Sequence, residues 1–238
     1  MKNKLKADAA TILAKLRSQS NPKNIAGMAR FGISVKGALG LSMPFLRSLG
    51  KQIGTDHALA IKLWRSGVHE ARILAGLIAD PKLTDRKLME SWVKDFNSWD
   101  ICDQVCMNLF DKTPFAFEQA VRWAKNEKEF VKRAGFALMA VLASHRRDLP
   151  EKEFMPFLPL IKKGAADERN FVKKAVNWAL RQYGKRNLKA QGIALRTARE
   201  ILSLANSAKD PAASRSARWV ANDAIRELTN PKVIRRLK

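Results

Sequence analysis

A short segment of the chain places an aromatic ring and a carboxylate at helical spacing. Ser98 is a residue type that favours helix starts, and a helix from Trp99 puts Asp103 one turn after that tryptophan. Both residues then lie at the edge of a buried apolar stripe, whose members are Ile101, Cys102, Val105, Cys106 and Leu109. Burial raises the pKa of such a carboxyl, and a nearby cation lowers it. Asp103 is therefore the first candidate for a carboxylate that takes part in chemistry.

The other residues with reactive groups fit structural roles better. Asp100 lies in the first turn of that helix, where the helix dipole favours an acid. Cys102 and Cys106 are one turn apart, and we expect them to be buried small apolar side chains. The three histidines are isolated in sequence, and no zinc-binding, phosphate-loop or serine-nucleophile motif occurs. The sequence thus predicts no metal site and no cofactor.

Two cationic positions farther along the chain are candidates for binding an anion. Trp178 projects from the margin of an apolar helix stripe between Lys174 and Arg181, an arrangement that suits contact with nucleic acid. Core packing explains a tryptophan at such a margin equally well. Arg133 precedes an uncharged stretch, residues 134–144, and either pairs with a carboxylate or binds a phosphate.

The charge balance narrows the class of partner. Lys and Arg number 45 against 22 Asp and Glu, a net charge of +23, and a polyanion would relieve such self-repulsion. Residues 161–238 carry 19 basic and 6 acidic side chains, so the excess grows toward the C-terminus. The 46% of hydrophobic residues supplies material for a core. No apolar run is long enough to span a membrane and no signal peptide is visible, so we expect a cytoplasmic protein.

The periodicity of apolar residues is helical almost throughout, and strand patterns are nearly absent. The spacing of turns predicts about a dozen helices of roughly 10 to 18 residues. Ser42, Thr55-Asp56 and Thr84-Asp85 mark three of the helix starts. No linker or low-complexity segment interrupts the chain, so we expect residues 1–238 to form a single domain.

An internal repeat predicts the architecture. The run of residues 126–134 recurs as residues 167–175, 41 residues later. The same offset relates two later pairs, Lys174 with Arg215 and Trp178 with Trp219. A period near 40 filled by two helices is typical of HEAT-type repeats, which bury their apolar faces by stacking on one another. The expected fold is an all-α, curved α-solenoid of HEAT-like helix pairs with a concave basic groove, which indicates nucleic acid as the partner.

Three short motifs lie in order along the chain. They are Ser98-Trp99-Asp100-x-x-Asp103, Lys132-Arg133-Ala134 and Lys174-Ala175-x-x-Trp178-x-Leu180-Arg181. The first resembles the Trp-Asp-x-x-Asp signature of the bacterial DNA alkylation repair family, the HEAT-like repeat alkylpurine DNA glycosylases of the AlkD type. The other two are similar to that family's second and third motifs. Weaker similarity at residues 28–31, 40–47 and 63–64 extends the likeness over nearly the whole chain.

The resemblance implies a monofunctional DNA glycosylase that removes N3- or N7-alkylated purines from double-stranded DNA in base excision repair. No metal or organic cofactor is implied, and we expect a monomer. The residue roles that the resemblance implies are a catalytic carboxylate for Asp103, contact with the sugar of the damaged nucleotide for Trp99 and Trp178, a phosphate contact for Arg133, and DNA binding for Lys174 and Arg181.

Two departures from the family pattern bear on the range of lesions. Ser98 stands where some members have Trp, and Phe31 stands where some have Tyr. Relatives with this fold that have lost the catalytic acid bind DNA without glycosylase activity. A non-catalytic HEAT-repeat protein that binds branched or bent DNA is therefore the main alternative, and a protein scaffold is a third. Base release from methylated DNA separates the enzyme from both, and salt-dependent DNA binding separates the second from the third.

Overall fold

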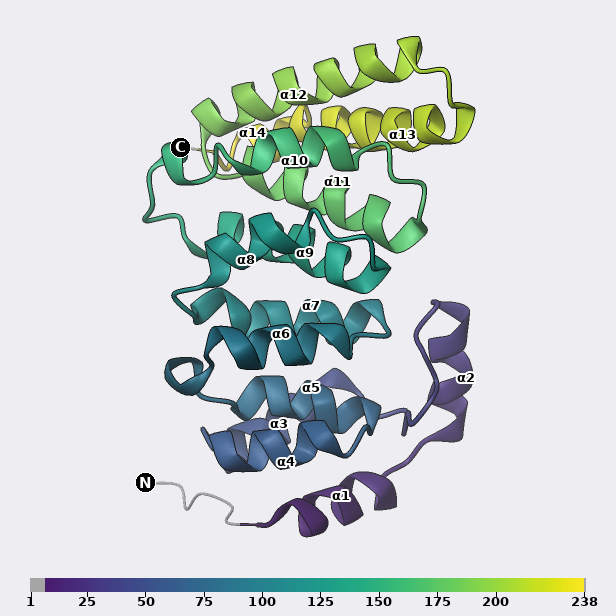
Figure 1. Ribbon diagram of the computed structural model, residues 1–238, viewed down its shortest axis with the longest axis vertical. Coiled ribbons are helices and arrows are strands. Elements are labelled where there is room, and N and C mark those ends of the chain that lie inside the picture. The colour runs from purple at the N-terminus through teal and green to yellow at the C-terminus, as the bar shows by residue number, and fades with distance from the viewer. Residues whose placement is uncertain (1–6, 238) are drawn as a thin grey trace. The chain divides into compact units, whose positions relative to one another are not determined.

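The computed structural model describes residues 7–237, which contain α-helices, short 3-10 helices and no strand (Figure 1). The first elements are α1 (Ala9–Ser18), α2 (Pro22–Arg30), α3 (Met43–Ile53), α4 (His57–Arg65), α5 (His69–Ile78), η1 (Pro81–Leu83), α6 (Arg86–Lys94), α7 (Trp99–Asn108) and η2 (Phe110–Lys112). They are followed by α8 (Ala116–Trp123), α9 (Glu129–His145), η3 (Glu151–Glu153), α10 (Phe157–Gly164), α11 (Asn170–Gly184), α12 (Leu188–Ser207), α13 (Pro211–Leu228) and α14 (Pro231–Ile234). The all-α class is confirmed, and the α-helices span a wider range of lengths than expected, from 4 to 20 residues.

Contacts within the chain divide it into two compact units, with the boundary between Thr113 and Pro114. Helices α1 to α7 belong to the first unit, and α8 to α14 belong to the second. Each unit is described by itself below. The single domain over residues 1–238 and the concave groove stay predictions.

The 41-residue repeat is visible as structure in the second unit. Helices α9, α11 and α13 begin at residues 129, 170 and 211, so consecutive starts are 41 residues apart. Each of these helices follows a partner helix, namely α8, α10 and α12. The phenyl rings of Phe130 and Phe171, which occupy the same position in two repeats, lie 5.5 Å apart. The helix-pair repeat predicted from the sequence is thus confirmed.

Side chains at the predicted helix starts cap them as expected. Ser42, Asp56 and Asp85 each accept a hydrogen bond from the backbone amide three residues ahead, which satisfies a donor that the helix leaves open. Asp210 accepts from the amide of Ala212 and precedes Pro211 at the first position of α13. Asp210 therefore caps the start of α13 in the short connection that follows α12.

Aromatic stacking and a buried helix form the two cores. In the first unit, the indole rings of Trp64 and Trp92 stack with their centroids 4.0 Å apart. The Trp64 Nε1 group donates to Asp95 Oδ2 at 2.8 Å, so the polar edge of this buried ring has a partner. In the second unit, residues 134–143 of α9 are all buried. The uncharged stretch noted in the sequence is therefore the central helix of its unit.

We expect Gly135→Ala to destabilise the second unit. A Cβ atom at Gly135 would lie 2.2 Å from the backbone nitrogen of Ala124, because α9 passes against the end of α8 at this point. Relief of that clash requires backbone movement, and overpacking of this kind costs about 1–3 kcal/mol. Gly192 in α12 is the matched control, since nothing lies within 4 Å of a Cβ placed there. Gly192→Ala should raise the stability by up to about 1 kcal/mol through helix propensity. Urea unfolding of both variants tests the pair, and equal stabilities would contradict the close packing.

Candidate functional site

The segment that begins at Ser98 forms helix α7 as predicted. Its apolar stripe is buried, with Ile101, Cys102, Val105, Cys106 and Leu109 exposed by 1% or less. Trp99 and Asp103 are both half-buried, so they lie at the edge of the stripe. Ser98 precedes the helix in extended conformation, but its hydroxyl does not cap the backbone. Instead, the buried Ser98 Oγ donates to Asp100 Oδ1 at 2.5 Å.

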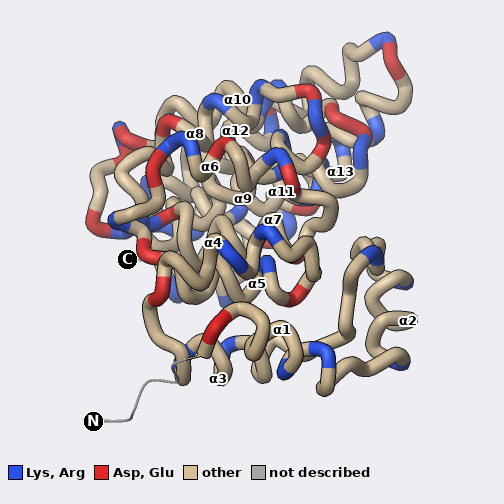
Figure 2. Tube along the Cα trace, turned by 60° about the horizontal axis from the view of Figure 1, so that its bottom comes forward, with Lys and Arg blue, Asp and Glu red and all other residues tan. Residues whose placement is uncertain are grey.

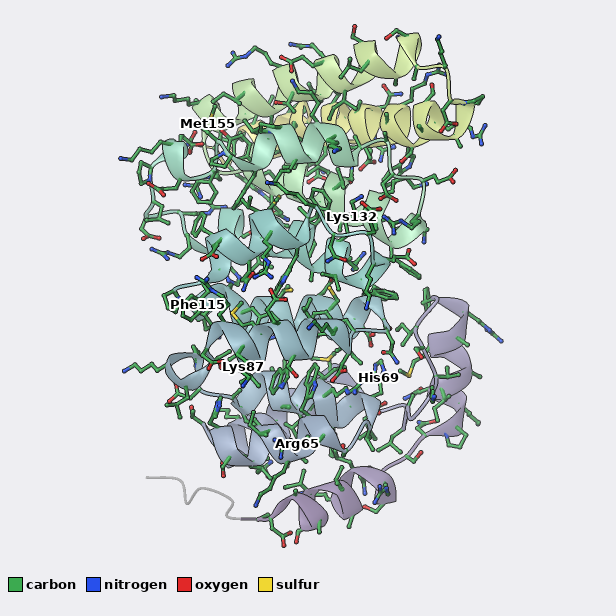
Figure 3. The ribbon with its side chains drawn as sticks, viewed as in Figure 1. Arg65, His69, Lys87, Phe115, Lys132 and Met155 are labelled. Carbon is green, nitrogen blue, oxygen red and sulfur yellow. The ribbon has the colours of Figure 1, made fainter. Side chains whose placement is uncertain are left out.

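Asp100 has a buried partner that the sequence did not indicate. His69, which is labelled in Figure 3, lies at the start of α5, and its Nε2 atom is 2.7 Å from Asp100 Oδ2. His69 is 2% exposed, so this pair is largely shielded from water. Burial raises the pKa of the Asp100 carboxyl, but the hydrogen bond and charge of His69 and the hydrogen bond of Ser98 outweigh burial and hold that pKa below its ordinary 3.8. Asp100 thus joins α7 to α5, a structural role that goes beyond the helix dipole.

The indole of Trp99 is held by the loop that follows α2. Its Nε1 group donates to the carbonyl oxygen of Phe31 at 3.0 Å. The Phe31 side chain is 74% exposed and contributes little to the core. The backbone carbonyl of Phe31, not its ring, positions the Trp99 indole. The position where some family members carry Tyr therefore lies directly beside the candidate site.

A buried glutamate holds the far end of the same loop. Glu70 is 1% exposed, and its carboxylate accepts hydrogen bonds from the backbone amides of Leu39, Gly40 and Leu41 at 2.8, 2.7 and 3.2 Å. Gly40 has a φ of +74°, and a Cβ there would lie 2.3 Å from the carbonyl oxygen of Asn21. Only glycine suits that position. No motif in the sequence predicted a role for Glu70.

A small cavity lies between this loop, α5 and α7. Its volume is about 230 Å³, and its lining includes Met28, His69, Trp99, Asp100 and Gln104. Asp103 is not among the lining residues. The two carboxylates of the Trp-Asp-x-x-Asp motif therefore have different surroundings. Asp100 forms hydrogen bonds with His69 and Ser98, while Asp103 lies at the edge of the buried apolar stripe of α7.

In the second unit, Arg133 is buried near the start of α9. It is 6% exposed, and its Nη1 group donates to the carbonyl oxygen of Phe171 at 2.6 Å. This bond ties α9 to the first turn of α11. Its role as a phosphate contact stays a prediction. Little of the Arg133 surface is accessible to a phosphate.

Helix α11 carries the other three predicted DNA contacts. Lys174 is exposed and Trp178 is half-buried, as expected at the margin of an apolar stripe. Arg181 instead forms ion pairs with Glu227, by its Nη1 group, and with Asp223 at 3.7 Å. Burial raises the pKa of Glu227, but Lys185 and Arg181 together hold it below its ordinary value, so the carboxylate is charged at neutral pH. Part of the charge of Arg181 is thus neutralised within the unit.

The predicted site residues fall into two groups. Trp99 and Asp103 share α7 in the first unit, while Arg133, Lys174, Trp178 and Arg181 lie on α9 and α11 of the second. Within residues 7–237, no three His, Cys, Asp or Glu side chains gather in a way that would hold a metal ion. In the same part of the chain, no helix combines the length and apolar character that a membrane span requires.

The helix pairs, their 41-residue spacing and the all-α composition define the class of a HEAT-like repeat protein. The profile of the family described as DNA alkylation repair enzyme matches residues 12–228. The chain therefore belongs to that family.

A solved structure has a similar fold. It is described as "a new family of proteins related to the HEAT-like repeat DNA glycosylases with affinity for branched DNA structures". The TM-score is 0.73 at 20% sequence identity, and the likeness covers 82% of this chain and 83% of that chain. No curated protein matches this chain.

Proposed function

We propose that this protein is a monomeric DNA glycosylase that hydrolyses the N-glycosidic bond of N3- or N7-alkylated purines in duplex DNA. The observation that carries the proposal is the position of Asp103 on α7, half-buried and one turn after Trp99. Membership of the DNA alkylation repair family and the net charge of +23 support it. The product is a free alkylated base and an abasic site.

The chemistry follows from the leaving group. Alkylation at N3 or N7 gives the purine a positive charge, so the base departs neutral and needs no general acid. The barrier lies at the sugar, where an oxocarbenium-like cation develops as the bond breaks. An ionised carboxylate beside that sugar stabilises the cation and orients the attacking water, as in glycoside hydrolysis. Asp103 has that role in the proposal, and no metal or organic cofactor takes part.

The aromatic residues have a matching role. The faces of Trp99 and Trp178 would contact the sugar of the damaged nucleotide, where a cation-π interaction favours the developing charge. Trp99 is suited to it because the Phe31 carbonyl fixes its ring. Lys174, exposed on α11, and Arg133 and Arg181 would contact the DNA backbone. Since Arg181 is paired with Glu227, we expect its contribution to depend on exchange of that partner for a phosphate.

The decisive experiment uses the wild-type protein. Duplex DNA that carries 7-methylguanine or 3-methyladenine is mixed with excess protein, with and without EDTA, and the release of free base is followed over a single turnover. We expect release well above the spontaneous rate, with no loss on addition of EDTA. Release at the spontaneous rate by a folded protein that binds the duplex would exclude the glycosylase.

A non-catalytic DNA binder is the second candidate. The observation in its favour is the likeness of fold to a protein described as having affinity for branched DNA. It predicts tighter binding to a four-way junction than to a duplex of equal length, and no base release. Competition between junction and duplex, measured beside the release assay, distinguishes the two candidates.

A further inference from the structure

Helix α13 carries a tryptophan at the position that Trp178 has in α11. Trp219 lies 41 residues after Trp178, the same interval that separates the starts of the two helices. Arg215 stands in the same relation to Lys174. The two helices pack against each other, and the Asn177 side chain of α11 donates to the Val220 carbonyl of α13 at 3.1 Å. The repeat therefore presents the same pattern of a cation and an indole twice.

Trp219 does not belong to the core. It is 40% exposed, whereas Trp64, Trp92 and Trp123 are 3% exposed or less. The core face of α13 is formed by other residues, namely Ala217, Val220, Ala221, Ala224 and Leu228. Lys173 Nζ lies 5.4 Å from the centroid of the Trp219 ring, a cation-π contact that orients the indole at the surface. An exposed indole among cations suits stacking on a base or sugar of a nucleic acid.

The charge around Trp219 is positive. Arg215 and Arg218 are both exposed, and neither forms an ion pair with a described residue. The first twelve residues of α13, 211–222, contain no acidic side chain. The acids farther along the helix, Asp223 and Glu227, are paired with Arg181, Lys185 and Arg226. Figure 2 shows basic segments along this helix. An anionic partner is therefore favoured over an apolar or cationic one.

We propose that Lys173, Lys174, Arg215, Arg218 and Trp219, here called the α13 patch, form a second contact with DNA. The inference rests on the proposed function in assuming that the ligand is DNA. Guanidinium groups bind backbone phosphates, and the indole face packs on a deoxyribose or base between them. Arg215, Arg218 and Trp219 lie on the repeat that follows the one with Trp178, so the patch extends the contact with duplex beyond the damaged nucleotide. It contributes affinity and leaves the chemistry to Asp103.

The first test removes charge from the patch. Binding of the full chain to an undamaged duplex is measured by fluorescence anisotropy over a range of salt concentrations. Each phosphate contact adds about 0.9 to the slope of log K against log salt, so Arg215→Gln with Arg218→Gln should lower the slope by roughly 1.8. The control is Arg196→Gln with Arg199→Gln, which removes two exposed arginines from α12 of the same helix pair. The control should leave the slope unchanged, and equal losses in the two variants would overturn the patch.

The second test concerns the indole. Trp219→Ala should weaken duplex binding about five- to tenfold through loss of stacking, and Trp219→Phe should restore most of it. Unchanged affinity for Trp219→Ala would overturn the role of the ring. Because the duplex is undamaged, these results do not depend on catalysis. A wild-type protein that binds but releases no base would refute the glycosylase and leave the patch standing. A wild-type protein that does not bind DNA would refute both.

Discussion

Asp103→Asn is expected to slow base release from methylated duplex DNA on the order of 10²- to 10³-fold while DNA affinity stays within about twofold. The substitution keeps the shape of the side chain and removes its negative charge. If that charge stabilises the sugar cation, its loss raises the barrier by about 3–4 kcal/mol and leaves the ground-state complex almost unaffected. Single-turnover release of 7-methylguanine measures the rate, and anisotropy on undamaged duplex measures the affinity.

The control for this experiment is Asp85→Asn. It removes one negative charge from the same unit at an exposed position, and Asn caps the N-terminus of α6 as well as Asp does. Its release rate should equal that of the wild type. Asp100 is unsuitable as a control because its carboxylate binds the buried His69. Equal rates for wild type and Asp103→Asn would exclude the catalytic assignment, whatever the affinity.

The features that follow from local spacing could be predicted from the sequence. The stripe of α7 and the edge positions of Trp99 and Asp103 depend only on a helix that begins at Trp99, and the structure has that helix. The 41-residue repeat likewise predicted helix pairs, and the starts of α9, α11 and α13 follow that interval because each pair repeats the same pattern of buried residues. Local periodicity was therefore sufficient to predict the buried face of α7 and the helix-pair repeat.

The partners of charged residues could not be predicted in the same way. His69 and Asp100 are 31 residues apart, and Arg181 and Glu227 are 46 residues apart. Such pairs form where one helix stacks on another, and the rotation of each helix about its axis decides which side chains meet. Arg133 shows the consequence. The sequence left open whether Arg133 pairs with a carboxylate or binds a phosphate, and in the structure this residue is 6% exposed and donates to the Phe171 carbonyl of α11.

The cavity beside Trp99 shows how a structural network can bear on the candidate site. His69 and Glu70 are consecutive residues at the start of α5, both line this cavity, and each binds a different segment. His69 holds α7 through Asp100, and Glu70 holds the loop before α3 through three backbone amides. The loop in turn supplies the Phe31 carbonyl to Trp99. One turn of α5 therefore holds both α7, which carries Trp99, and the loop that binds the Trp99 indole.

Glu70→Ala should accordingly cause the largest loss of stability among the substitutions considered. It leaves the amides of Leu39, Gly40 and Leu41 without the carboxylate that they share. Each buried donor without a partner costs about 1–3 kcal/mol. Water that enters the loosened loop binds some of these amides and so lowers the total cost. We expect the free energy of unfolding to fall by about 3–5 kcal/mol. Urea unfolding followed by circular dichroism measures the change.

Two further variants separate the carboxylate from a general effect of truncation. Glu70→Gln keeps one carbonyl oxygen but turns an amide donor toward backbone donors, so its loss should be large although smaller than that of Glu70→Ala. Lys87→Ala, at an exposed position of α6, should change the stability by less than about 0.5 kcal/mol. The loosened loop should also free the Trp99 indole, so base release per folded molecule of Glu70→Gln should slow. A Glu70→Ala protein as stable as Lys87→Ala would show that the loop does not depend on Glu70, and the positioning of Trp99 would then need another cause.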